Sequence, residues 1–150
     1  MRLTEVEAYG GKDDPASHAF GSRTNRNEPM YGPAGTLYVY LSYGVHWCAN
    51  VVVGPAGTPN AVLMRGGEVV EGRRTAERRR GRATDLSNGP GRLGQALGLN
   101  GSHSGLDLFS GPIRLEGPFG SVTTWSATPR IGISKAIDTP WRFIEAEESS

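Results

Sequence analysis

The sequence has little cysteine, little lysine and no long apolar run. Its single cysteine, Cys48, excludes a disulfide bond within the chain and favours a reducing compartment. No apolar stretch approaches the ~20 residues that a membrane-spanning helix needs, so we expect no membrane segment. Met1 and Arg2 lead directly into an alternating strand pattern, and we therefore expect no signal peptide.

Arginine takes the place of lysine almost everywhere. The chain has fourteen arginines and two lysines, and seven of the arginines lie between Arg73 and Arg92 with only two acids. That segment carries about +5 although the net charge of the chain is +1. Because a guanidinium can make two hydrogen bonds to one phosphate, this bias favours contact with nucleic acid. A solvated helix face is the alternative interpretation of the same charges.

A dense run of β-branched and aromatic residues extends from Met30 to Val53. Such residues favour strands, and Gly44 divides the run into two arms, so we predict a β-hairpin. The period-two alternation of strands places Tyr38 and Tyr40 on one face. Tyr43 falls at the turn, where it could act as a wedge between stacked bases. Aromatic packing inside an ordinary core hairpin is the alternative.

The segment from Arg2 to Tyr9 alternates in the same way and predicts a strand. Its Glu7 and Tyr9 lie on one face, roughly 6–7 Å apart at ~3.3 Å per residue. A carboxylate beside an aromatic ring fits either an ordinary solvent-facing surface or a general base next to a stacking ring.

The rest of the chain alternates short elements with loops. Gly10–Pro29 is a predicted loop, and nothing near its His18 offers the spacing of metal ligands. We predict strands at 61–65, 113–116, 130–133 and 141–146, helices at 68–80 and 90–97, and a frayed tail at 146–150. These elements indicate the α+β class: a single mixed domain over residues 1–150, with a curved, mainly antiparallel sheet, a protruding β-hairpin and a few packed helices.

Six segments, taken together and in this order, resemble the 3-methyladenine (alkyladenine, N-methylpurine) DNA glycosylase family. The segments are Thr4–Tyr9 with His18, Arg23–Asn27, Gly35–Tyr40 through Tyr43–Asn50, Val62–Arg65, Gly89–Leu97 and Pro129–Ile133. The resemblance covers the chain nearly from end to end. Compared with that family, this chain is short at the N-terminus and begins almost on the strand that carries Glu7.

The resemblance implies a monofunctional DNA glycosylase that flips a damaged purine out of duplex DNA and hydrolyses its N-glycosidic bond, which initiates base excision repair. Its substrates would be alkylated or deaminated purines such as 3-methyladenine, 7-methylguanine, hypoxanthine and ethenoadenine. Glu7 matches the carboxylate that deprotonates the attacking water, and Arg65 matches its partner in placing that water. No lysine stands in the pocket pattern, so no lyase step is expected, nor is a cofactor or a metal ion.

The remaining site residues are also implied by the resemblance. Tyr9, His18 and Tyr40 match the walls between which the extruded base stacks. Asn50 matches the residue that obstructs the amino group of normal guanine, and Tyr43 the residue that fills the vacated space in the duplex. The positions that match contacts to the DNA backbone are Arg23, Arg26, Val45 and Arg92.

Two other interpretations stay open at this point. The chain could be a catalytically impaired DNA-binding module of the same fold, or a domain without a nucleic-acid partner whose arginines are only solvated. Phosphate contacts require a steep dependence of DNA affinity on salt, which the last interpretation does not. The expected partner is double-stranded DNA containing a damaged purine, bound by a monomer in the cytoplasm or nucleoid of a bacterium or in the nucleus of a eukaryote.

Overall fold

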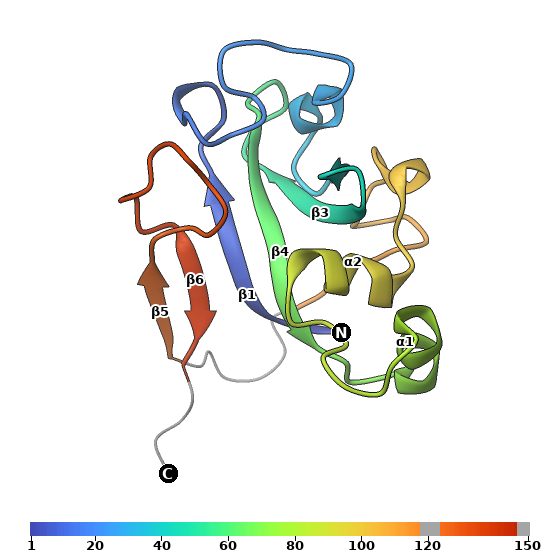
Figure 1. Cartoon of the computed structure of the whole chain (residues 1–150). Coiled ribbons are helices and arrows are strands. Elements are labelled where there is room, and N and C mark those ends of the chain that lie inside the picture. The colour runs from blue at the N-terminus through green and yellow to red at the C-terminus, as the bar shows by residue number, and fades with distance from the viewer. Residues whose placement is uncertain (118–123, 147–150) are drawn as a thin grey trace.

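An antiparallel sheet of six strands forms the centre of the computed structural model, which describes residues 1–117 and 124–146 (Figure 1). The strands are β1 (Arg2–Tyr9), β2 (Leu37–Ser42), β3 (His46–Val53), β4 (Asn60–Glu68), β5 (Trp125–Thr128) and β6 (Arg142–Glu145). Their order across the sheet is β2-β3-β4-β1-β6-β5. The first strand of the chain therefore lies inside the sheet, between β4 and β6.

The strand register brings residues from distant parts of the chain into one row. Tyr38 pairs with Asn50, and Asn50 pairs with Leu63. Leu63 pairs in turn with Glu7, and Glu7 pairs with Arg142. Directly paired residues point to the same face of a sheet. A phenol, an amide, a carboxylate and a guanidinium consequently share one face.

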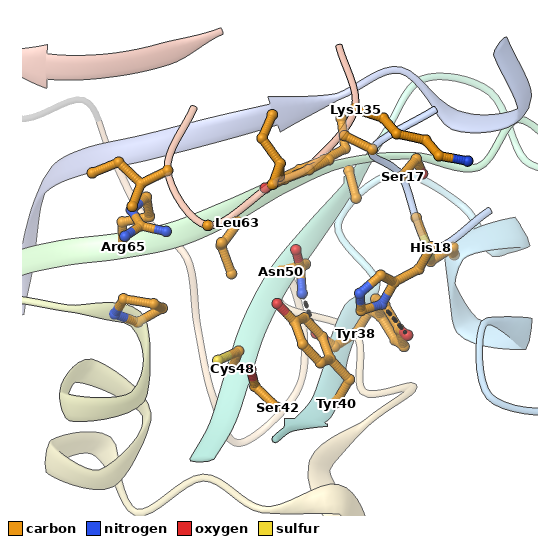
Figure 2. Close-up of a pocket in the computed structure, with 18 of the residues that line it drawn as sticks. Ser17, His18, Tyr38, Tyr40, Ser42, Cys48, Asn50, Leu63, Arg65 and Lys135 are labelled. Carbon is orange, nitrogen blue, oxygen red and sulfur yellow. Dashed lines mark hydrogen bonds between the residues drawn. The ribbon is translucent and has the colours of Figure 1, made fainter. Parts of the chain in front are cut away.

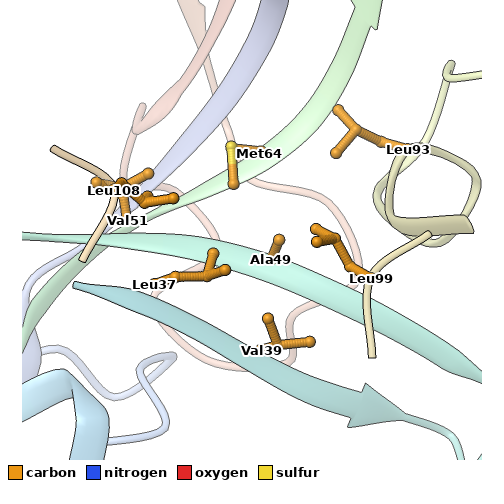
Figure 3. Packing of buried hydrophobic residues seen from close by; sticks show 8 residues of the cluster. All are labelled: Leu37, Val39, Ala49, Val51, Met64, Leu93, Leu99 and Leu108. Atoms are coloured by element: carbon orange, nitrogen blue, oxygen red, sulfur yellow. The ribbon is translucent and has the colours of Figure 1, made fainter. Parts of the chain in front are cut away.

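The opposite face packs against α2 (Pro90–Leu97) and buries an apolar core (Figure 3). The buried side chains of this core are Leu37, Val39, Ala49, Val51, Met64, Leu93, Leu99 and Leu108. The helix lies so close to β3 that a Cβ at Gly94 would stand 2.1 Å from the carbonyl oxygen of Trp47. Only glycine permits this approach.

The polar face is covered by the long connection between β1 and β2. Ala19, Met30 and Tyr31 from that connection bury Tyr38 and Val52 in a second apolar cluster. The connection includes two of the three short 3₁₀ helices, which span Gly11–Asp13, Glu28–Tyr31 and Gly101–His103. Loop and short 3₁₀ helices, rather than an α-helix, therefore cover this face of the sheet.

Most of the predicted elements are confirmed. The strand at 2–9 and the helix at 90–97 have the predicted bounds, and the hairpin forms from β2 and β3. The strand at 61–65 lies within the longer β4, and the strand at 141–146 corresponds to β6. Two helices and an antiparallel sheet in one domain confirm the α+β class.

Other predicted elements are wrong. The helix expected at 68–80 begins only at Arg73, because β4 continues to Glu68 and Gly72 has a left-handed backbone with φ +73. No strand forms at 113–116 or 130–133, whereas β5 was not predicted. In the second of these segments the N–H of Ile131 binds a carboxylate instead of a neighbouring strand. Of the frayed tail expected at 146–150, residues 147–150 lie outside the described residues.

Both α-helices are eight residues long. α1 (Arg73–Arg80) packs against α2 at the side of the molecule (Figure 1). Within residues 1–117 and 124–146, no helix has the length and apolar character required to cross a bilayer.

Candidate active site

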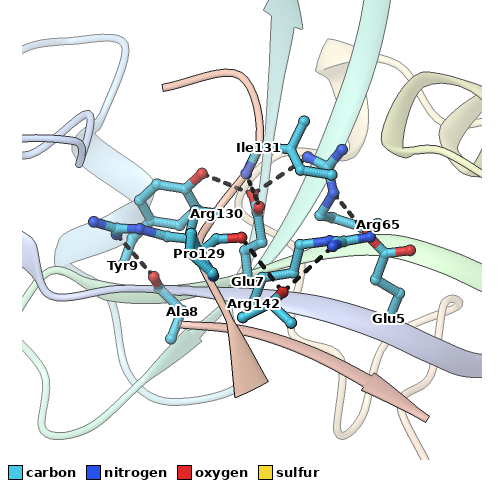
Figure 4. A network of polar contacts seen from close by, with 10 residues as sticks. Glu5, Glu7, Ala8, Tyr9, Arg65, Pro129, Arg130, Ile131 and Arg142 are labelled. Atoms are coloured by element: carbon cyan, nitrogen blue, oxygen red, sulfur yellow. Dashed lines mark hydrogen bonds and ion pairs between the residues drawn. The ribbon is translucent and has the colours of Figure 1, made fainter. Parts of the chain in front are cut away.

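A fully buried carboxylate, Glu7, lies near the C-terminal end of β1 and accepts three hydrogen bonds (Figure 4). Its Oε1 accepts from the hydroxyl of Tyr9 at 2.9 Å and from Nη1 of Arg65 at 3.2 Å. Its Oε2 accepts from the backbone N–H of Ile131 at 2.6 Å. These three donors come from β1, β4 and the segment after β5, and together they hold the carboxylate in a fixed position away from bulk water.

Arg65 connects this carboxylate to a second one. Its Nε donates to Oε1 of Glu5 at 3.1 Å, and Nε of Arg142 donates to the same oxygen at 2.7 Å. The register of β1 against β4 shifts on both sides of Glu5, and Arg65 is left without a direct partner in β1. Such an irregularity re-aims a side chain. Arg65 can therefore reach across to both acids of β1.

A pocket of about 580 Å³ opens in front of this network (Figure 2). Ligand pockets of proteins typically measure roughly 300–1,000 Å³, so a nucleobase fits in size. Its wall includes all the predicted base-stacking residues, Tyr9, His18 and Tyr40, together with Arg65. Glu7 itself is not part of the wall but lies behind Tyr9, Arg65 and Ile131.

The aromatic wall is held by edge contacts. The rings of His18 and Tyr40 meet at a centroid distance of 4.3 Å and an interplanar angle of 70°, and Nδ1 of His18 lies 3.1 Å from the hydroxyl of Tyr38. His18 as a residue is exposed, but desolvation of its ring, which packs against Tyr38 and Tyr40, and then the charge of Arg26 lower its pKa, so its imidazole is neutral at neutral pH. Burial, and then the charge of Glu7, raises the pKa of Tyr9, so its hydroxyl stays a donor to that carboxylate.

Asn50 lies in the pocket wall, almost fully buried, on the strand next to the tyrosines. Its Nδ2 donates to the backbone oxygen of its strand partner, Tyr38, at 3.2 Å. Figure 2 shows its oxygen on the side away from that bond. The amide is therefore fixed in orientation, as a group that discriminates between base edges must be.

Tyr43 stands at the exposed end of the hairpin. Its side chain is 91% exposed, and its backbone is left-handed, with φ 51. A left-handed backbone is uncommon for any residue with a bulky side chain. Together with Gly44 at φ 67 it forms a tight turn closed by a bond from the N–H of Val45 to the carbonyl of Ser42. The turn directs an aromatic ring away from the protein, at the rim of the pocket.

The four positions expected at the DNA backbone are scattered. Arg26 lines the pocket, with its guanidinium 5.6 Å from the centroid of the Tyr40 ring. Arg23 is paired with Glu28, and Val45 is exposed beside Tyr43. Arg92 is exposed in the first turn of α2. The structure therefore brings the predicted catalytic and stacking residues together with Arg26, whereas Arg23, Val45 and Arg92 do not line the pocket.

Several residues of the site were missed from the sequence. Tyr38 lines the pocket, and its period-two spacing from Tyr40 was a sufficient signal. Asp14 and Arg130 form a buried ion pair whose partners are far apart in sequence, so no local pattern indicates it. Lys135 lines the pocket, and the expectation that no lysine belongs to it is wrong. Among the described residues, no group of three or more His, Cys, Asp and Glu side chains could hold a metal ion.

The chain is similar to known proteins over nearly its whole length. The family model described as methylpurine-DNA glycosylase (MPG) matches residues 1–149. Three relatives are each named "Putative 3-methyladenine DNA glycosylase". The relative from Rhodococcus jostii is 48% identical and covers 95% of this chain and 68% of its own length. The relative from Frankia casuarinae is 51% identical and covers 100% of this chain and 77% of its own length. The relative from Nocardia farcinica is 50% identical and covers 95% of this chain and 73% of its own length. The chain belongs to the methylpurine-DNA glycosylase family.

Proposed function

We propose that this glycosylase flips alkylated or deaminated purines out of duplex DNA and hydrolyses their N-glycosidic bonds, with Glu7 as the catalytic carboxylate. The observation that carries the proposal is a buried carboxylate directly behind an aromatic pocket of the right size for a base. Family membership supports the class of reaction. The candidate substrates are 3-methyladenine, 7-methylguanine, hypoxanthine and ethenoadenine, and the bound species is a monomer on damaged double-stranded DNA.

Flipping is required because an atom inside a base stack is out of reach of a protein pocket. Extrusion costs a few kcal/mol, and least for a lesion that already pairs poorly. Stacking on aromatic rings returns about 1–3 kcal/mol per base in single-strand binders. Tyr9, His18 and Tyr40 supply such rings, and Tyr43 enters the duplex in place of the departed base.

Cleavage of the glycosidic bond leaves positive charge on the sugar. A carboxylate held in a water-poor site stabilises an oxocarbenium-like transition state and can take a proton from the attacking water. Glu7 has three of its roughly four acceptor positions filled, which leaves capacity on Oε2 for one water molecule. Arg65 contacts the other oxygen and lines the pocket, so it can help to place that water beside the carboxylate.

Selectivity and product follow from the pocket. A cationic alkylpurine is already a good leaving group, and Asn50 excludes the amino group of normal guanine. Lys135 lines the pocket but is solvent-exposed, whereas a Schiff-base lysine is normally activated by desolvation. We therefore propose hydrolysis to an abasic site without strand cleavage.

The test is base release by Glu7→Gln from methylated duplex DNA. We expect release to be lost and affinity for a lesion-containing duplex to stay within a few-fold of wild type, because glutamine keeps the shape but cannot take a proton. Glu68→Gln, which changes an exposed acid at the end of β4, is the matched control. Undiminished release by Glu7→Gln would contradict the proposal. Binding without release by the wild-type protein would favour a DNA-binding module instead.

A further inference from the structure

A buried ion pair lies behind the wall of the pocket. The side chains of Arg130 and Asp14 are 0% and 3% exposed, and both terminal nitrogens of Arg130 donate to the two oxygens of Asp14. Asp14 also accepts from the N–H groups of Gly10 and Ala16. Although burial alone would raise the pKa of Asp14, the hydrogen bonds from Arg130 and from these N–H groups lower it. The pair is therefore ionised and joins the β1–β2 connection to the segment after β5.

Arg130 also touches the strand that carries Glu7. Its guanidinium lies 4.8 Å from the centroid of the Tyr9 ring and 5.3 Å from that of Trp141, and Nη1 donates to the carbonyl of Ala8 at 3.0 Å (Figure 4). Arginine stacks well on aromatic faces. Tyr9 is consequently held between the carboxylate that its hydroxyl binds and the guanidinium beside its ring.

Ile131, the residue after Arg130, links this ion pair to Glu7. Ile131 gives its N–H to Oε2 of Glu7 at 2.6 Å, and its side chain lines the pocket. Residues 129–135 form no strand, so no ladder of backbone hydrogen bonds holds this N–H in place. The anchor nearest to it in sequence is the side chain of Arg130.

We propose that the Asp14–Arg130 pair is a positioning unit for base excision, which holds the Tyr9 hydroxyl and the Ile131 N–H against Glu7. The proposal rests on the proposed catalytic role of Glu7. A buried ion pair is commonly no more stabilising than a well-packed apolar substitute, so its main consequence here is geometric. Catalytic groups displaced by a fraction of an ångström lose rate more than affinity.

The experiment uses two variants of the whole chain, Arg130→Lys and Asp14→Asn. Arg130→Lys keeps the positive charge but loses the bidentate hydrogen bonds to Asp14. Single-turnover release of hypoxanthine from a duplex should fall at least tenfold at saturating enzyme. Affinity for a duplex holding a tetrahydrofuran abasic analogue should change less than threefold. Leu108→Ala, a change in the apolar core on the other face of the sheet, is the control for lost stability alone. It should lower the unfolding midpoint and leave the rate of release unchanged.

A second readout does not depend on activity. The amide hydrogen of Ile131 should exchange slowly with solvent in the wild-type protein and at least tenfold faster in Arg130→Lys. Fast exchange in the wild type overturns the proposal even if neither variant folds, and so does a folded Arg130→Lys that releases base at the normal rate. A normal rate of base release by Arg130→Lys, together with an inactive Glu7→Gln, would refute this inference alone. A fully active Glu7→Gln would refute the function on which it rests.

Discussion

Glu7 and Tyr43 belong to the same site but are held in opposite ways. Glu7 is fully buried and bound by three donors from three parts of the chain. Tyr43 is 91% exposed on a turn whose left-handed backbone is costly for a bulky residue. The hydrogen bonds around Glu7 are thus complete within the free chain. The ring of Tyr43, the proposed wedge, is left uncovered by the chain itself and would be covered only by a partner such as the proposed DNA duplex.

We expect the largest effect from removing the charged partner of the buried Glu7. Arg65→Leu leaves Glu7 without its charged partner, and removing one member of a buried ion pair typically costs about 3–5 kcal/mol. We expect a loss of about 3 kcal/mol in the free energy of unfolding, measured in urea, and a loss of base release. Arg2→Leu, which removes the ion pairs of a half-exposed arginine with Glu68 and Glu145, should lower the unfolding midpoint much less. Equal destabilisation by the two variants would show that burial of Glu7 does not set the cost.

A change at the exposed Tyr43 should affect DNA affinity and leave stability nearly unaltered. Tyr43→Gly removes the ring but suits the left-handed backbone, so the unfolding midpoint should stay close to that of the wild type. Affinity for a lesion-containing duplex should fall about ten- to hundredfold, in line with the loss of one stacking contact. Val70→Gly, at another exposed position, should leave DNA affinity unaltered. A Tyr43→Gly protein that binds normally would contradict the assignment of the turn to the DNA.

A smaller effect separates the two interpretations of the basic segment. Arg92 is exposed, and its hydrogen bond within the described part of the chain goes to a neutral amide, that of Asn88, whereas Arg73 is bound to the carboxylate of Glu77 and the carbonyl of Ala83. Arg92→Gln should reduce the slope of log affinity against log salt by about 1, as expected for one phosphate contact. Arg73→Gln should leave that slope unchanged. Identical slopes for both variants and the wild type would favour a solvated surface.

The smallest effect concerns the pH response of the aromatic wall. The pKa of His18 is lower in the folded protein than its ordinary value of 6.5, so the unfolded chain takes up the proton first as the pH falls. The contribution of His18 to stability is therefore complete above about pH 6.5 and is lost as the pH falls through its folded-state pKa. Urea unfolding at pH 5.5 and 7.5 should differ less for His18→Phe than for the wild type. The same difference in both proteins would argue against a lowered pKa of His18 in the folded protein.

Local patterns predicted the elements whose signals are local. The alternation in residues 2–9, the aromatic run around Gly44 and the proline at the start of α2 each act within a few residues, and each element formed as expected. The errors arose where long-range contacts decide the backbone. Residues 130–133 have the apolar alternation of a strand, but the buried acids of distant segments bind Arg130 and Ile131 instead.

The candidate site could be predicted only in part for the same reason. Glu7 beside Tyr9 follows from strand geometry, and the grouping of His18, Asn50 and Arg65 with them followed only from the family resemblance. Nothing local indicated that Asp14 would pair with Arg130 or that Lys135 would reach the pocket. Such contacts depend on which strands become neighbours, which no single segment specifies.

By itself, the sequence determined which residues alternate toward one face, where the hairpin turns and where the helix after Pro90 begins and ends, because these properties depend on near neighbours. The tertiary structure alone decided that Glu7 would be buried, with donors from β4 and from the segment after β5 around it. The physical reason is the register of the antiparallel sheet, which places β1 between β4 and β6 and so brings a carboxylate and its hydrogen-bond donors together from opposite ends of the chain.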